Sequence, residues 1–306
     1  MTFFNMRQAA IITTLASSAA CLVAAGWLGT SPALAQSEGP AIQPLKPEVR
    51  DGATTKSTKQ PTTTSAPAVK PPSEEVMKVL KALEAAGDKY ATINSDVTYE
   101  LVNRVLGEKE VRTGWIAYQK ADEKKPPMFR VSFDKLIQEG APQKEEVDYA
   151  FDGYFLTTRK PKIKQMIRYQ VAVRGQKVQP LKLGRSPFPL PFGQKVDDMV
   201  RFFQITTRKP FKRDPDNTVY LKLLPRKSQE KNLNFTRLEM WIDKKTHLPV
   251  KAVSYGKDKN RTTVEFEDLQ LNKDNERTTF RLPMPPAGWE FKVVPLDRDK
   301  PKPDRN

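Results

Sequence analysis

The sequence predicts a mainly β (α+β) fold, built on a strongly curved or partly closed antiparallel sheet with helices on one face. Three observations carry this prediction. About 10–11 segments alternate apolar and polar residues with a period of two and are separated by turn residues. Only two segments have helical spacing of apolar residues, and strands and helices do not alternate along the chain.

The two helical segments are amphipathic. The first covers about 73–86, where Ser73 suits an N-cap and Gly87 suits a helix end. The second covers about 194–204, again with apolar residues three and four positions apart. Each helix has one apolar stripe, and we expect that stripe to pack on the sheet.

The strands are expected on both sides of an apolar loop. In the loop, 180–193, Pro187, Pro189 and Pro191 exclude a central strand, with Phe188, Leu190 and Phe192 between and after them. A last recognisable segment covers 280–289. The expected strands are 97–104, 111–118, 129–134, 147–151, 154–158, 163–173, 219–224, 235–242, 249–255 and 262–271.

The N-terminus has the order of a secretory signal peptide. Residues 1–35 contain Arg7, then an apolar stretch, then Ala33-Leu34-Ala35. The apolar stretch is about as long as a bilayer is thick, so an uncleaved anchor is the alternative. Its Ser and Thr content and the small residues at its end favour cleavage. We therefore expect export to the periplasm or cell envelope.

The remaining sequence divides by composition. Residues 36–72 are rich in Pro, Thr, Ser and Lys, and we expect a disordered tether because such a segment buries little apolar surface. The folded domain is expected over 73–295, followed by a charged tail, 296–306.

Charge and cysteine content limit the function. The formal net charge is +16, which favours polyanions such as an anionic membrane surface, whereas export argues against nucleic acid. The only cysteine, Cys21, lies in the signal peptide. The mature chain then has no disulfide, thiolate metal site or cysteine nucleophile. We expect no metal and no cofactor.

The sequence has no recognisable catalytic motif. His247 is the only histidine, and it lies in an expected turn. The chain has no Gly-x-Ser-x-Gly elbow, phosphate loop or dinucleotide-binding fingerprint. No pair of carboxylates stands out for glycoside hydrolysis. We therefore expect no catalytic residues and no enzyme; the alternative, a hydrolase, would have to use His247 as its base.

Short motifs in a fixed order resemble a known family, the LolA/LolB-like superfamily of periplasmic lipoprotein carriers. The resemblance covers about 74–294. Its motifs are Gly114-Trp115-Ile116-Ala117-Tyr118, Lys125-Pro126-Pro127-Met128-Phe129-Arg130, Asp148-Tyr149-Ala150-Phe151-Asp152-Gly153, Tyr220-Leu221-Lys222-Leu223-Leu224-Pro225, Leu238-Glu239-Met240-Trp241-Ile242-Asp243, Leu248-Pro249, Thr262-Thr263-Val264-Glu265-Phe266 and Phe280-Arg281-Leu282-Pro283 through Gly288.

The resemblance implies a half-open, strongly curved antiparallel β-barrel with helices over the open side and acyl chains held inside. A basic residue before the proline of the second motif, often Arg in the family, helps to gate the lid, and this chain has Lys125 there. Lys125 and Arg130 would lie at the cavity mouth, and Phe188, Leu190 and Phe192 would form a lid or membrane loop. The expected cavity lining is Tyr99, Trp115, Phe129, Phe133, Met240 and Phe266.

These features predict a non-enzymatic carrier or chaperone of the cell envelope that binds lipid or an acylated lipoprotein. We expect it to be a monomer. The alternative is an envelope sensor or interaction module of the same fold that binds a protein or an acidic polymer. Ionic strength separates the two, because polyanion binding weakens as salt rises while acyl burial persists.

Overall fold

The computed structural model describes residues 71–123, 125–173, 192–231, 233–273 and 280–296. The contacts within the chain divide it into two units, 1–39 and 40–306, and every described residue belongs to the second. This unit is mainly β. It contains one twelve-stranded sheet and two α-helices, which confirms the predicted fold class.

The first half of the chain contains one helix followed by six strands. These are α1 (Glu74–Lys89), β1 (Thr92–Asn103), β2 (Glu108–Gln119), β3 (Met128–Gln138), β4 (Ala141–Phe151), β5 (Phe155–Lys160), the 3-10 turn η1 (Pro161–Ile163) and β6 (Gln165–Gln170). The second half follows the same plan. It contains α2 (Val196–Phe202), β7 (Phe203–Arg208), β8 (Thr218–Pro225), β9 (Phe235–Asp243), β10 (Pro249–Gly256), β11 (Arg261–Leu271) and β12 (Glu290–Val294).

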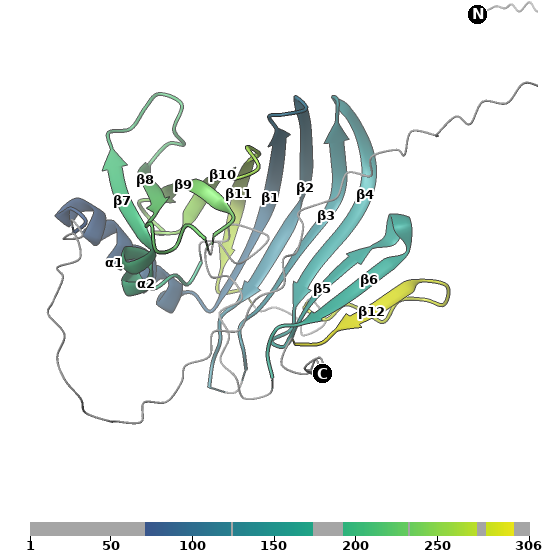
Figure 1. Ribbon diagram of the computed structural model, residues 1–306. Coiled ribbons are helices and arrows are strands. Elements are labelled where there is room, and N and C mark those ends of the chain that lie inside the picture. Colours follow the sequence, from purple (N-terminus) through teal and green to yellow (C-terminus); the bar gives the residue numbers. More distant parts are fainter. Residues whose placement is uncertain (1–70, 124, 174–191, 232, 274–279, 297–306) are drawn as a thin grey trace, which may run out of the picture. The chain divides into compact units, whose positions relative to one another are not determined.

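The two halves join through β1 and β11 in the middle of the sheet. The strand order is β12-β6-β5-β4-β3-β2-β1-β11-β10-β9-β8-β7, so β12 and β7 are the edges and the sheet is open. All pairs are antiparallel except β12 with β6, which is parallel. The long strands β1 to β4 bend along their length (Figure 1). The sheet is therefore curved and half-open, as predicted.

The start of α1 agrees with the sequence and its end does not. The Ser73 hydroxyl accepts a hydrogen bond from the backbone N–H of Val76 at 3.4 Å, as an N-cap does. The helix continues past Gly87 to Lys89. A Cβ at position 87 would lie only 3.0 Å from Cα of Gly193. Gly87 thus permits close packing of two backbone segments and does not end the helix.

Strand register defines an inner face of the sheet. Leu221, Met240, Ala252, Val264 and Tyr99 lie opposite one another in turn across β8, β9, β10, β11 and β1. Because side chains alternate along a strand, this row and its second neighbours share one face. We call it the inner face and its opposite the outer face.

The helices cover one half of the inner face. The apolar stripe of α1 packs with α2 residues against β7 to β10. We call this group the helix-covered cluster. Its buried members are Val76, Leu80, Leu83, Val196, Met199, Phe203, Ile205, Leu221, Leu223, Leu233, Phe235, Leu238, Met240, Ile242 and Ala252.

Several predicted boundaries differ from the structure. The second helix ends at Phe202, and β7 begins at the next residue, where the sequence pattern predicted more helix. Strand β6 is shorter than the expected 163–173, and β12 follows the expected segment 280–289. Residues 1–70 and 297–306 lie outside the described residues, as do Phe188 and Leu190. Of the helices that are described, none is long and apolar enough to span a bilayer.

Candidate functional site

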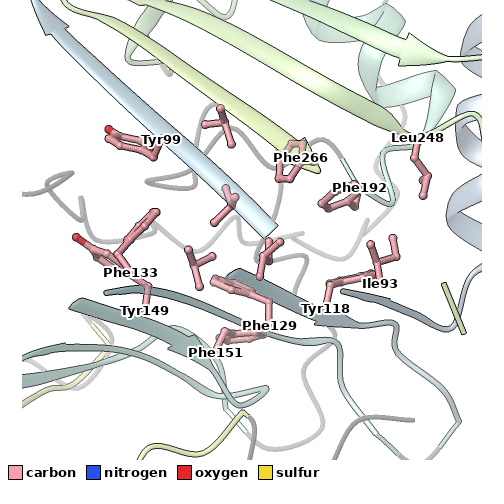
Figure 2. Close-up of a cluster of buried hydrophobic side chains, with 14 of the residues drawn as sticks. Ile93, Tyr99, Tyr118, Phe129, Phe133, Tyr149, Phe151, Phe192, Leu248 and Phe266 are labelled. Carbon is pink, nitrogen blue, oxygen red and sulfur yellow. The ribbon is translucent and has the colours of Figure 1, made fainter. Parts of the chain in front are cut away.

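A cluster of buried aromatic side chains lies on the other half of the inner face. Figure 2 shows side chains of β1 and β11 facing those of β3 and β4. We call this group the inner-face cluster. Its aromatic members are Tyr90, Tyr99, Tyr118, Phe129, Phe133, Tyr149, Phe151, Phe192 and Phe266, with aliphatic side chains between them.

The register of the strands explains this gathering. Phe129 lies opposite Phe151 and Phe133 lies opposite Val147 in the β3–β4 pair. The rings of Phe129 and Phe151 have centroids 5.9 Å apart, and those of Tyr99 and Phe133 are also 5.9 Å apart. These distances are within the range of favourable aromatic pairs. Alternation along adjacent strands is thus sufficient to build an apolar aromatic surface on one face of the sheet.

Phe192 is the described residue of the apolar loop that reaches this cluster. Its ring centroid lies 5.2 Å from that of Phe266 and 6.3 Å from that of Tyr118, onto which it stacks. Figure 2 shows it beside Phe266. Phe192 is only 2% exposed. It therefore covers part of the inner-face cluster from outside the sheet.

The six residues expected to line a cavity divide into three groups. Tyr99, Phe129, Phe133 and Phe266 lie together in the inner-face cluster. Met240 shares their face of the sheet but belongs to the helix-covered cluster. Trp115 lies on the outer face, because its neighbours Gly114 and Ile116 face inward and its partner in β3 is Ser132.

The two expected mouth residues are also separated. Arg130 lies on the outer face, where its guanidinium stands 5.0 Å from the Trp115 ring and donates to Asp148. A residue next to Phe129 in a strand lies on the opposite face, so Arg130 does not line the inner-face cluster. Lys125 is exposed in the loop before β3, where its backbone N–H donates to the Asp122 carboxylate at 2.7 Å.

The inner face also carries a buried ion group that sequence reasoning missed. Arg112 on β2 is 2% exposed and lies opposite Tyr99 of β1. Its guanidinium donates to Glu110 at 2.7 Å and to Glu145 at 3.5 Å. Burial raises the pKa of the Tyr99 phenol above its ordinary value. The inner-face cluster thus borders, beside Tyr99, a charged group made of Arg112, Glu110 and Glu145.

No catalytic arrangement is evident around His247. It occupies the turn between β9 and β10 with a φ of 57°, and its backbone N–H donates to the carbonyl of Asp243. Across the described part of the chain, no three His, Cys, Asp or Glu side chains gather as a metal site requires.

No protein family model and no curated protein matches the sequence. Solved structures do match. An uncharacterized conserved protein from Thermus thermophilus has 12% identity over 72% of this chain and 99% of its own, with a TM-score of 0.41. Lipoprotein LppX from Mycobacterium tuberculosis has 10% identity over 67% and 99%, with a TM-score of 0.40. An outer membrane lipoprotein-sorting protein domain from Vibrio parahaemolyticus has 13% identity over 67% and 95%, with a TM-score of 0.34.

Proposed function

We propose that this chain is a non-enzymatic binding protein of the cell envelope that holds the acyl chains of a lipid or acylated lipoprotein against the inner-face cluster. The observation that carries the proposal is the gathering of Tyr99, Phe129, Phe133 and Phe266 on one face of an open, curved sheet. The helices pack mainly on the other half of that face, and Ala86 near the end of α1 reaches this cluster. The order of the sequence motifs supports the same class of function.

An apolar site is sufficient for this task. Transfer of each methylene from water contributes about 0.8 kcal/mol, so one chain of about fourteen methylenes contributes on the order of 10 kcal/mol. A carrier therefore needs no catalytic group to retain its cargo. The aromatic rings provide a large contact area with few rotatable bonds, which limits the entropy lost on binding.

Entry of an acyl chain requires a rearrangement, because the cluster is already buried. Phe129, Phe133 and Tyr149 are each 1% exposed. Among the described residues, Phe192 contacts this surface without belonging to the sheet. In the proposed function the acyl chain replaces the ring of Phe192 between Tyr118 and Phe266. The rest of the expected lid, Phe188 and Leu190, lies outside the described residues.

The first test is to identify what the protein carries. Residues 36–306 are purified from their native envelope, and native mass spectra are recorded before and after solvent extraction. Extractable mass that matches a lipid or an acylated protein would support the proposal and identify the cargo. An empty protein that also takes up no added fatty-acyl probe would refute it.

A variant then locates the site. Phe133→Asp places a charge in the inner-face cluster, and we expect acyl-probe binding to be lost because a buried unpaired carboxylate is strongly unfavourable. Phe211→Asp is the control, since Phe211 is 64% exposed in the loop between β7 and β8. Circular dichroism checks that both fold. If Phe133→Asp does not fold, Phe133→Leu, which shortens the apolar surface only, should weaken binding.

A second candidate function is docking to an acidic polymer or partner. Lys160, Lys162 and Lys164 lie around the β5–β6 hairpin beside Ile163, which is 47% exposed. No ion pair within the described residues engages these three lysines. Binding of this kind should weaken strongly between low and high salt. Acyl-probe binding by the inner-face cluster should change little over the same range.

A further inference from the structure

The outer face carries a groove that lies on the opposite side of the sheet from the inner-face cluster. It has a volume of about 540 Å3 and lies between strands β5 and β6 and residues 280–284. Leu156 and Tyr169, which lie opposite each other, face the inner-face cluster. Their neighbours Thr157 and Arg168 line the groove and therefore lie on the outer face. The thickness of the sheet separates the two sites.

The walls of the groove combine apolar and polar side chains in similar measure. Met166 and Phe280 are buried along it, and Val173 and Met284 are 45% and 64% exposed at its edges. The volume is within the range of sites for small molecules, about 300–1,000 Å3. The groove therefore has the size and lining of a site for a small amphiphile.

Arg168 gives the groove a cation with unused hydrogen-bond donors. Its guanidinium lies 4.3 Å from the Phe155 ring centroid and makes, within the described residues, one hydrogen bond, 3.3 Å long, to the Asp152 carboxylate. A guanidinium has five N–H donors. Its side chain is 26% exposed, so the remaining donors are accessible. Arg130 differs, because it directs two nitrogens to Asp148.

Asp152 cannot fully offset the positive charge of this groove. Its other carboxylate oxygen already accepts the backbone N–H groups of Tyr154 and Phe155, at 3.1 and 2.9 Å. Arg281 also lines the groove, is exposed and forms no ion pair with any described residue. Two arginines against one aspartate leave an excess of one positive charge. The groove should therefore favour an anion.

We propose that this outer groove binds a medium-chain fatty acid, with the carboxylate on Arg168 and Arg281 and the chain along Met166, Phe280 and Met284. Arginine forks match the planar carboxylate, and the apolar wall matches the alkyl chain. This site is distinct from the proposed acyl site of the inner-face cluster. It would allow the protein to sense or hold a free fatty acid independently of its main cargo.

The test uses residues 36–306 and a ten-carbon fatty acid with a diazirine near the end of its chain. After photolysis, mass spectrometry of peptides locates the label. If the fatty acid binds in the groove, the label should appear in residues 166–173 and 280–284. Added decanoate should reduce this labelling, and added decanol should not. Label confined to peptides 129–133 and 147–151 would overturn the groove and support the inner site. Label in the groove alone would count against the proposed function, and no label at either place would overturn both.

Charge variants complete the test. Arg281→Glu should weaken decanoate binding in the groove about tenfold or more, the usual effect of losing a charge-assisted hydrogen bond. Arg104→Glu is the matched control, because it makes the same charge change at an exposed position in the β1–β2 turn. Equal effects of the two variants would mean non-specific attraction and would overturn the proposal. Arg168→Met, which keeps the apolar stem over Phe155, should also weaken groove labelling.

Discussion

Gly114 of β2 lies directly against Phe133 of β3. A Cβ at position 114 would lie 1.9 Å from the carbonyl oxygen of Ser132 and 2.8 Å from Cα of Phe133. The register shifts at this place, since Gly114 pairs with Phe133 and Thr113 pairs with Lys135. The extra residue in β3, Asp134, forms a bulge. It allows Phe133 and Leu136, three positions apart, to be buried on the same face.

We expect Gly114→Ala to lower the free energy of unfolding by about 2–4 kcal/mol, since the added methyl would force two backbones apart. Urea denaturation followed by circular dichroism measures it. Gly107→Ala is the control, because Gly107 has a φ of 75° and no atom lies within 4 Å of the place that an added methyl would occupy. Gly107→Ala should lower the free energy of unfolding by about 1 kcal/mol, from backbone strain alone. Equal losses in the two variants would contradict a packing role for Gly114.

Asp148 provides a second prediction. This outer-face carboxylate is 2% exposed and accepts hydrogen bonds from Arg130 at 2.8 Å and Arg159 at 3.1 Å. Asp148→Asn removes the charge between two arginines, and we expect a loss of about 3–5 kcal/mol in unfolding free energy. The control, Glu146→Gln, breaks an exposed ion pair with Lys144 and should change the free energy of unfolding by about 0.5 kcal/mol or less. A small effect of Asp148→Asn would show that water solvates both arginines adequately.

Period two is a local signal, and it located ten of the twelve strands in the described residues, all except β7 and β12. The aromatic residues of β3, Phe129 and Phe133, were identified from it and lie in the inner-face cluster. Ser73 was identified as an N-cap by the same kind of local pattern. Tyr149 was not among the residues expected to line the cavity. It lies on the same face of β4 as Val147 and Phe151, and strict use of period two would have included it.

The errors arose where the two faces of a strand had to be distinguished. On β2, Trp115 was assigned to the inner face, while the other face contained Glu110 and Arg112. These charges compensate each other and are buried, so the polar-looking face is the inner one. Met240 was assigned to the cavity because the sequence does not show which half of the face the helices cover. That coverage depends on contacts between distant segments.

The alkaline stability of the fold depends on Tyr118. Burial, with a smaller contribution from the negative charge of Asp88, raises the pKa of Tyr118 to about 12. In the unfolded chain the phenol loses its proton near pH 10. Above that pH the unfolded state binds fewer protons than the folded state, so stability falls as pH rises from about 10 to about 12.

We therefore expect the free energy of unfolding to fall between pH 9 and pH 11.5, and to fall less in Tyr118→Phe. The difference between the two proteins should be on the order of 2 kcal/mol. Urea titrations at both pH values measure it, and the comparison of slopes removes any constant effect of the lost hydroxyl. Parallel curves for the two proteins would mean that Tyr118 ionises normally in the fold.

Phe192 provides the prediction that bears most directly on cargo entry. If its ring occupies the place of an acyl chain between Tyr118 and Phe266, the closed form competes with binding. Phe192→Ala should then raise the affinity for a fluorescent fatty acid, because a larger fraction of the protein is competent to bind. The same change should lower the free energy of unfolding by about 3–5 kcal/mol, as truncation of a buried Phe does.

Phe203→Ala is the matched control for this prediction. Phe203 is 1% exposed and stacks on Phe235 in the helix-covered cluster, with ring centroids 6.0 Å apart. Its truncation should destabilise the fold to a similar degree and leave the affinity for the fatty acid unchanged. Higher affinity in both variants would indicate general loosening. Lower affinity in Phe192→Ala would mean that the Phe192 ring forms a wall of the site, and the acyl chain would then have to lie beside this ring instead of replacing it.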